Sequence, residues 1–124
     1  MTSMIKFIDA NIFIERWTNA RAFEFTNSLN SEEHCTSVLV LAEVYHKLQL
    51  KKVNSAFEYL RTIMGAVKVY EFYQSDLFNA LKSNLDINFN DKIHIAIMKR
   101  NNIKMIISFD KDFDKDKTII RQEL

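Results

Sequence analysis

Two kinds of apolar pattern alternate along this chain. Short apolar or alternating stretches predict β-strands at residues 4–8, 34–37, 67–72, 104–107 and 118–121. Longer stretches with apolar side chains every three or four positions predict α-helices from residue 11 onwards and at residues 20–30, 38–50, 54–64, 75–84 and 91–100. This alternation favours a parallel sheet covered on both faces. We expect a three-layer α/β/α sandwich around a mainly parallel sheet of four or five strands.

The same pattern predicts how some helices begin and which side chains they bury. Ser37, Ser75 and Asn90 are placed to accept hydrogen bonds from the first backbone N–H groups of the helices that follow them. Asn101 and Asn102 suit the end of helix 91–100, because asparagine tolerates the left-handed conformation there. The helical period also places three large apolar side chains in the core: Phe23, Phe57 and Met64.

Composition narrows the class of protein. A length of 124 residues predicts one domain spanning residues 1–124, large enough to bury a core without disulfides or structural metals. The 17 basic and 16 acidic residues leave a net charge of +1, so binding to a polyanion would need a local patch. Cys35 is the only cysteine, which fits a reducing compartment. With no N-terminal leader and no apolar run of membrane length, we expect a cytoplasmic protein.

Four acidic residues stand where predicted strands end or helices begin. Asp9 directly follows strand 4–8, and Asp110 lies just past strand 104–107. Glu43 sits in the second turn of the helix after strand 34–37, and Asp91 opens a helix that must run antiparallel to the strands. In a parallel α/β sheet these positions share the carboxyl edge, where ligands bind. We therefore expect the four carboxylates to lie close together.

Such a cluster points to a metal site. Carboxylates at close spacing repel one another and stay ionised together only when a cation compensates them. Hard oxygen ligands select Mg²⁺ or Mn²⁺. Such ions orient a phosphodiester, activate water and stabilise the leaving oxygen. That chemistry needs no glycine-rich phosphate loop, which a chain whose one glycine is Gly65 could not build.

Three segments carry a resemblance to a known family. The stretches FIDANIFI (7–14), LAEVYHKL (41–48) and NDKIHIAIMKRNNIKMIISFDKDFDK (90–115) resemble the successive motifs of PIN-domain ribonucleases, and most of all VapC-like toxins of toxin–antitoxin pairs. The resemblance implies that the metal-binding, catalytic acids are Asp9, Glu43, Asp91 and Asp110. It implies supporting polar roles for two further residues, Asn11 and Ser108.

The resemblance also implies an activity and partners. Members of this family cleave RNA with a divalent metal, form homodimers and are inhibited by a partner antitoxin. RNA affinity is largely electrostatic, so with a net charge of +1 the chain would need a local basic patch. The candidates are Arg16, Lys47, Lys51 and Lys52.

Some of these residues have simpler interpretations. Asp9 would also serve as a helix N-cap, and Asp91 would suit the positive end of a helix dipole. Three further acids alternate with lysines in a pattern typical of a solvated turn, which places them outside the site: Asp112, Asp114 and Asp116. An outer ligand role for Asp112 or Asp114 remains the alternative. The histidines lack metal-ligand spacing and are expected to be structural or exposed: His34, His46 and His94. Phe13 and Trp17 could contribute to a dimer face.

Two other functions remain open. The chain could be a PIN-fold scaffold that binds RNA or protein with an idle nuclease site, although the loss of one acid would be the sign of that class. It could be a phosphotransfer domain of the haloacid-dehalogenase type, which also begins with a strand and an aspartate. That chemistry requires a second aspartate where this chain has Asn11.

Overall fold

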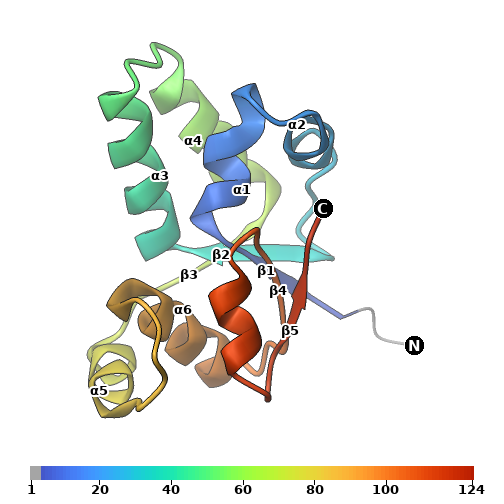
Figure 1. Cartoon of the computed structure of the whole chain (residues 1–124). Helices are drawn as coiled ribbons and strands as arrows, with labels where there is room; N and C mark the ends of the chain where they lie inside the picture. The colour runs from blue at the N-terminus through green and yellow to red at the C-terminus, as the bar shows by residue number, and fades with distance from the viewer. Residues whose placement is uncertain (1–3) are drawn as a thin grey trace.

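The computed structural model describes residues 4–124 and contains one five-stranded sheet (Figure 1). All four strand pairings are parallel, in the order β3-β2-β1-β4-β5. The strands are β1 (Lys6–Ile8), β2 (His34–Ser37), β3 (Lys68–Tyr70), β4 (Met105–Ile107) and β5 (Ile120–Gln122). The prediction of a three-layer α/β/α sandwich around a mainly parallel sheet of four or five strands is therefore confirmed, although every strand except β2 is shorter than predicted.

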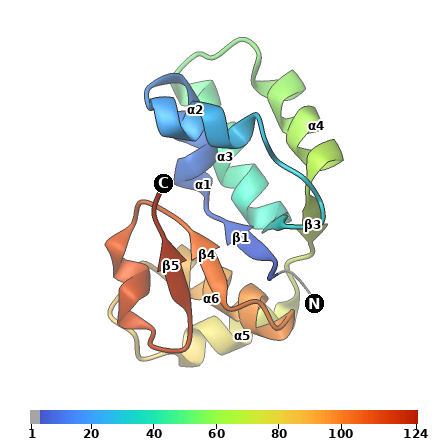
Figure 2. The same cartoon turned by 90° about the vertical axis from the view of Figure 1, so that its right-hand side faces the viewer.

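Helices cover both faces of this sheet. One layer contains α1 (Ala10–Ile14), α2 (Ala20–Thr26), α3 (Val38–Leu50) and α4 (Ala56–Ala66), and the 3₁₀ turn η1 (Glu15–Trp17) links its first two members. The other layer is the packed pair α5 (Gln74–Lys82) and α6 (Phe89–Arg100). A second 3₁₀ turn, η2 (Lys111–Lys115), joins β4 to β5. Figure 2 shows the two helical layers above and below the strands.

The core follows from burial on both faces of the central strands. In β1, Phe7 pairs with Cys35 of β2 on one side and with Ile106 of β4 on the other. Both Phe7 and its neighbour Ile8 are fully buried, so consecutive residues of the strand face apolar layers on opposite sides. Near-continuous apolar runs of this kind are typical of parallel strands covered by helices.

The strand order reverses beside β1, and that reversal positions the site. From β1 the chain first builds outward through β2 and β3, then crosses to the far side of β1 to add β4 and β5. Residues that follow β1 and β4 therefore meet at the carboxyl edge of the sheet, where α/β folds bind ligands. The backbone N–H of Asp9 donates to Ile107 O over 3.1 Å, which ties the two strand ends together.

Two of the predicted helix caps are wrong. Ser37 does cap α3, accepting from Val40 N over 3.2 Å. Helix α6, however, begins at Phe89 because Asn88 accepts from the N–H of Asn90 over 2.8 Å. Helix α5 begins at Gln74 with Tyr73 as its N-cap, so Ser75 lies inside the first turn rather than before it. At α5 the start is instead closed by Asp76, whose carboxylate accepts from the backbone N–H of Tyr73 over 2.8 Å.

Several apolar side chains lie differently from the helical-period prediction. Phe23, Phe57 and Met64 are exposed, because α2 and α4 present other residues to the core, such as Ala22 and Leu60. Phe13 is fully buried and so cannot form the predicted dimer face. Trp17 of that pair is 46% exposed.

Asp116 also departs from its prediction as part of a solvated turn. It is 5% exposed, and its carboxylate accepts from Thr118 Oγ1 over 2.6 Å and lies 3.1 Å from Lys99 Nζ. Although burial alone would raise the pKa of this carboxyl, these partners lower it below its ordinary value. Asp116 is therefore a structural anion.

None of the helices within residues 4–124 has both the length and the apolar character needed to span a membrane.

Candidate metal centre

The four predicted acids line a single pocket of about 410 Å³ at the carboxyl edge of the sheet. Asp9 follows β1, Glu43 projects from α3, Asp91 lies in the first turn of α6 and Asp110 follows β4. Four segments far apart in sequence thus contribute one carboxylate each. Other polar residues complete the lining: Asn11, Lys47, Asn88, Asn90 and Asp112.

Asp9 is the most buried of the four acids, at 5% exposure. One carboxylate oxygen accepts from Ala10 N over 2.8 Å, so Asp9 is indeed the N-cap of α1. The other oxygen accepts from Ser108 Oγ over 2.7 Å and from Asn11 Nδ2 over 3.2 Å. Burial raises the pKa of Asp9 in spite of these bonds. The cap and the cluster are therefore two roles of one side chain.

Asn11 and Ser108 connect the two strand ends beneath Asp9. Asn11 Nδ2 donates to Ser108 Oγ over 3.1 Å, and Asn11 Oδ1 accepts from Phe109 N over 3.3 Å. Ser108 Oγ also accepts from Asp110 N over 3.0 Å. Because Ser108 is fully buried, this network fixes the orientation of Asp9 and the start of the segment that carries Asp110.

Glu43 is half-buried and has two partners on α6. Its Oε1 lies 2.8 Å from His94 Nε2, and its Oε2 accepts from Asn90 Nδ2 over 3.2 Å. Burial alone would raise the pKa of Glu43, but these two partners lower it. Asn90 is not the N-cap of α6, as predicted, and its side chain donates to this carboxylate instead.

Sequence reasoning missed two charged or titratable residues of the site. Asp112, predicted to lie outside it in a solvated turn, lines the pocket, and His94 lies among the acids. His94 was expected to be structural or exposed, yet its side chain is 1% exposed and its Nε2 lies 3.9 Å from Asp9 Oδ1 as well as beside Glu43. Burial alone would lower its pKa, and the surrounding acids together raise it. A signal was present in the sequence, because His94 stands three residues after Asp91 and so on the same face of the helix.

Asp91 and Asp110 complete the pocket wall. Burial raises the pKa of Asp91 to about 7, and the charges of Asp9 and Asp110 add to that increase while His94 opposes it. Asp110 begins η2 and accepts from Asp112 N over 2.9 Å. A carboxyl whose pKa is raised to about 7 by burial and by neighbouring carboxyls ionises against their charge. A bound cation would reduce that repulsion.

A comparison with protein-family models identifies the fold independently of this geometry. The model described as the PIN domain matches residues 6–117, which is nearly the whole chain. The chain belongs to the PIN domain family. The predicted family is therefore confirmed. Comparison with curated protein sequences finds no match for this PIN domain.

Solved structures share the fold at low sequence identity. A toxin–antitoxin complex from Klebsiella pneumoniae has a TM-score of 0.73 and 15% identity, covering 96% of this chain and 99% of that one. VapC20 of Mycobacterium tuberculosis, described as a sarcin-ricin loop cleaving toxin, has a TM-score of 0.70 and 22% identity over 87% and 92% of the two chains. VapBC2 of Rickettsia felis, bound to a fragment of its promoter DNA, has a TM-score of 0.71 and 16% identity, covering 97% of this chain and 98% of that one.

The donor set of this PIN domain fits a divalent cation. Asp9, Asp91 and His94 each offer a ligand atom within 4.8 Å of the other two. Glu43 and Asp110 line the same pocket but stand outside this tightest group. Carboxylate oxygens predominate, which suits a hard ion such as Mg²⁺ or Mn²⁺.

The four predicted RNA-binding residues have different surroundings. Lys47 lines the acidic pocket. Arg16 donates to Thr26 Oγ1 over 2.8 Å, so its guanidinium links η1 to α2. Lys51 and Lys52 are exposed just past the end of α3. RNA contact by these four residues stays a prediction.

Proposed function

We propose that this PIN domain is a divalent-metal-dependent endoribonuclease that acts as the toxin of a toxin–antitoxin pair. The convergence of Asp9, Glu43, Asp91 and Asp110 in one pocket of a PIN fold is the observation that supports this function. The chain retains an acid at all four positions, which speaks against a scaffold with an idle site. Asn11 stands where phosphotransfer chemistry would need a second aspartate.

Each side chain has a proposed role. The four acids would hold Mg²⁺ or Mn²⁺, and the bound metal supplies water activation and stabilisation of the leaving oxygen. Asn11 and Ser108 keep Asp9 in one orientation through their hydrogen bonds to its carboxylate. His94 places positive charge or a donated proton between two acids, which limits their mutual repulsion.

The proposed partners are an RNA substrate, a cognate antitoxin protein and a second copy of this chain. The similarity in fold to a toxin–antitoxin complex and to VapBC2 supports the antitoxin. VapC20 is described as cleaving the sarcin-ricin loop, which makes a structured RNA with an exposed loop a reasonable first substrate to test.

The direct test is cleavage by the purified protein, freed of any partner. We expect discrete fragments from a loop-containing RNA in Mg²⁺ or Mn²⁺, and intact RNA when a chelator is added. Fragments that form equally fast with chelator present would point to a metal-independent or contaminating nuclease and would contradict the proposal.

Metal binding has a separate readout in thermal stability. A cation that binds the folded state alone stabilises it by mass action, by about 2.7 kcal/mol at a concentration 100 times its Kd. Mg²⁺ or Mn²⁺ should therefore raise the melting temperature, and Asp91→Asn should lose most of that shift. The matched control is Asp114→Asn, the same chemical change at an exposed carboxylate that pairs with Arg121. Equal shifts in both variants would show that Asp91 does not bind the ion.

The metal-free protein should also show a defined pH dependence. Because the folded state raises the pKa of Asp91 from 3.8 to about 7, its contribution to stability is greatest below pH 3.8 and is lost as the pH rises through 7. Asp9 and His94, whose pKa values are also raised, act in the same direction. Glu43, whose pKa is lowered from 4.5, titrates below this window. In chelator the melting temperature should fall between pH 5 and pH 8, and Asp91→Asn should flatten that fall.

A further inference from the structure

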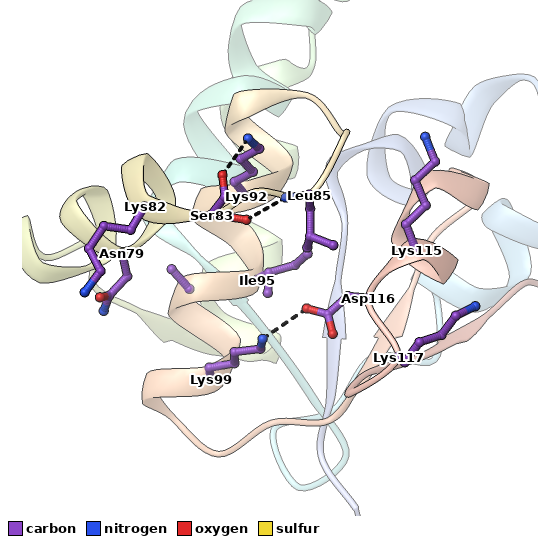
Figure 3. Close-up of a pocket in the computed structure, with 11 residues that line it drawn as sticks. Asn79, Lys82, Ser83, Leu85, Lys92, Ile95, Lys99, Lys115, Asp116 and Lys117 are labelled. Atoms are coloured by element: carbon purple, nitrogen blue, oxygen red, sulfur yellow. Dashed lines mark hydrogen bonds and ion pairs between the residues drawn. The ribbon is translucent and has the colours of Figure 1, made fainter.

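A second pocket, of about 400 Å³, lies between α5, α6 and η2 (Figure 3). Among its charged lining residues are five lysines and one carboxylate, Asp116. The acidic pocket has the opposite composition, with five carboxylates and one lysine. A protein whose net charge is only +1 thus has one pocket lined mainly by lysines and another lined mainly by carboxylates. The lysines are Lys82, Lys92, Lys99, Lys115 and Lys117.

Backbone carbonyls hold several of these ammonium groups in place. Lys92 Nζ donates to Ser83 O over 3.1 Å, Lys115 Nζ to Asp86 O over 2.9 Å and Lys117 Nζ to Asp114 O over 3.1 Å. A carbonyl orients an ammonium without cancelling its charge. Lys99 pairs with the buried carboxylate of Asp116, and Lys115 pairs with Asp112, so among the described residues three of the five lysines have no carboxylate partner. The pocket therefore keeps a strong positive charge.

The lysine side chains surround the mouth of this pocket. Figure 3 shows Lys82 on one side and Lys115 and Lys117 on the other, with Leu85 and Ile95 between them. Lysine commonly lays its stem on apolar surface and leaves its charged end in water. Positive groups spread around a mouth suit an extended polyanion that lies across it better than one small anion deep inside.

The two pockets are neighbours on the same elements. In α6, Asp91 lines the acidic pocket and the next residue, Lys92, lines the lysine pocket. In and beside η2, Asp112 lines the first pocket and Lys115 the second, and Lys115 Nζ lies 3.5 Å from Asp112 Oδ1. A bound polymer that passes from the acidic pocket across η2 would next contact the lysines.

RNA needs such a surface if it is to reach the acids. The carboxylates repel a phosphate backbone except where a bound cation compensates them. Affinity for a nucleic acid comes mainly from lysine and arginine beside its phosphates. The positive charge must therefore lie outside the acidic pocket yet within reach of the same strand.

We propose that the lysine pocket binds the backbone phosphates of a single-stranded RNA whose adjacent segment lies in the acidic pocket. This inference rests on the proposed nuclease function and assigns the substrate track to α5, α6 and η2. It adds a surface that the sequence did not indicate, since the basic residues expected to bind RNA were on or near α1 and α3.

The test is RNA binding in Mg²⁺, measured by fluorescence anisotropy across a range of salt concentrations on a labelled single strand whose phosphorothioate backbone resists cleavage. The variant is Lys82→Gln/Lys117→Gln, which leaves the Lys99–Asp116 pair intact. Its matched control is Lys68→Gln/Lys104→Gln, two exposed lysines at the opposite, amino edge of the sheet. The ammonium groups of Lys68 and Lys82 each lie 5.1 Å from the centre of an aromatic ring on their own element. Both double variants therefore lose one similar lysine–aromatic contact.

We expect the pocket variant to bind RNA about three- to tenfold more weakly at physiological salt, with the slope of log K against log salt reduced by about 1.4 for two lost contacts. The control should bind like the parent. Circular dichroism and the metal-induced melting shift should show that both variants are folded with the acidic pocket intact.

Each alternative result identifies which idea fails. A parent that cuts RNA while the pocket variant binds like the control would overturn this inference and leave the nuclease function standing. Lysine-dependent RNA binding by a parent that never cuts would overturn the nuclease function alone. A parent with no RNA affinity would overturn both. Pocket variants that keep RNA affinity but lose binding to a polyglutamate peptide would assign the surface to an acidic protein segment instead.

Discussion

Asp91→Asn should reduce the rate of RNA cleavage by about 10³-fold or more at saturating RNA and metal, as expected when a residue that positions the reacting groups is removed. The change is nearly isosteric, and asparagine can occupy the first turn of α6. It removes one of the acids that would hold the metal, which weakens both water activation and leaving-group stabilisation. Single-turnover rates with excess protein would measure the chemical step directly.

Asp91 is a better position for this test than Asp9. Asp9 also caps α1 and accepts from Ser108, so its replacement would disturb the fold as well as the chemistry. The control is again Asp114→Asn, which lies outside the acidic pocket and should keep the parental rate. A folded Asp91→Asn protein that cleaves at the control's rate would show that cleavage does not need this carboxylate, which would contradict the proposed metal-dependent mechanism.

The sequence predicted the sheet and its acids because those depend on local patterns. Strands β1 and β4 are short apolar segments, and the parallel topology places Asp9 and Asp110, which follow them, at one edge of the sheet. Predictions of individual helix faces were less successful. Phe57 and Met64 have the right spacing for burial, but the large apolar side chains that α4 buries are Leu60 and Ile63. Periodicity defines a face and does not say which neighbour covers it.

The parts of the site that the sequence left open depend on tertiary contacts. His94 resembles any helical histidine until Glu43 of α3 is placed 2.8 Å away. The alternating acids and lysines after β4 looked like one solvated turn. In the structure that turn divides them, with Asp110 and Asp112 in one pocket and Lys115 and Lys117 in the other. Residues this close in sequence diverge because η2 is a tight 3₁₀ turn, and no spacing rule shows which pocket each one faces.

Asp76→Asn should cost about 3 kcal/mol of unfolding free energy, the lower end of the range for breaking a buried ion pair. The carboxylate of Asp76 is 1% exposed and accepts from Arg100 Nε and Nη2, each over 2.9 Å. It also accepts from Tyr73 N over 2.8 Å, which closes the start of α5. The lower end applies because Arg100 is 24% exposed and water would partly solvate it once unpaired.

This ion pair joins α5 to α6, the helix that carries Asp91 and His94, so its loss should also weaken the support of the candidate site. Urea unfolding of the parent, Asp76→Asn and Asp114→Asn would measure the loss in unfolding free energy. The Asp114–Arg121 pair has an acid that is 54% exposed, so its loss should cost less than about 1 kcal/mol. Equal stability of the two variants would mean that apolar packing alone holds α5 against α6. A large loss confined to Asp76→Asn would show that a buried ion pair fixes the helix on which the acidic pocket depends.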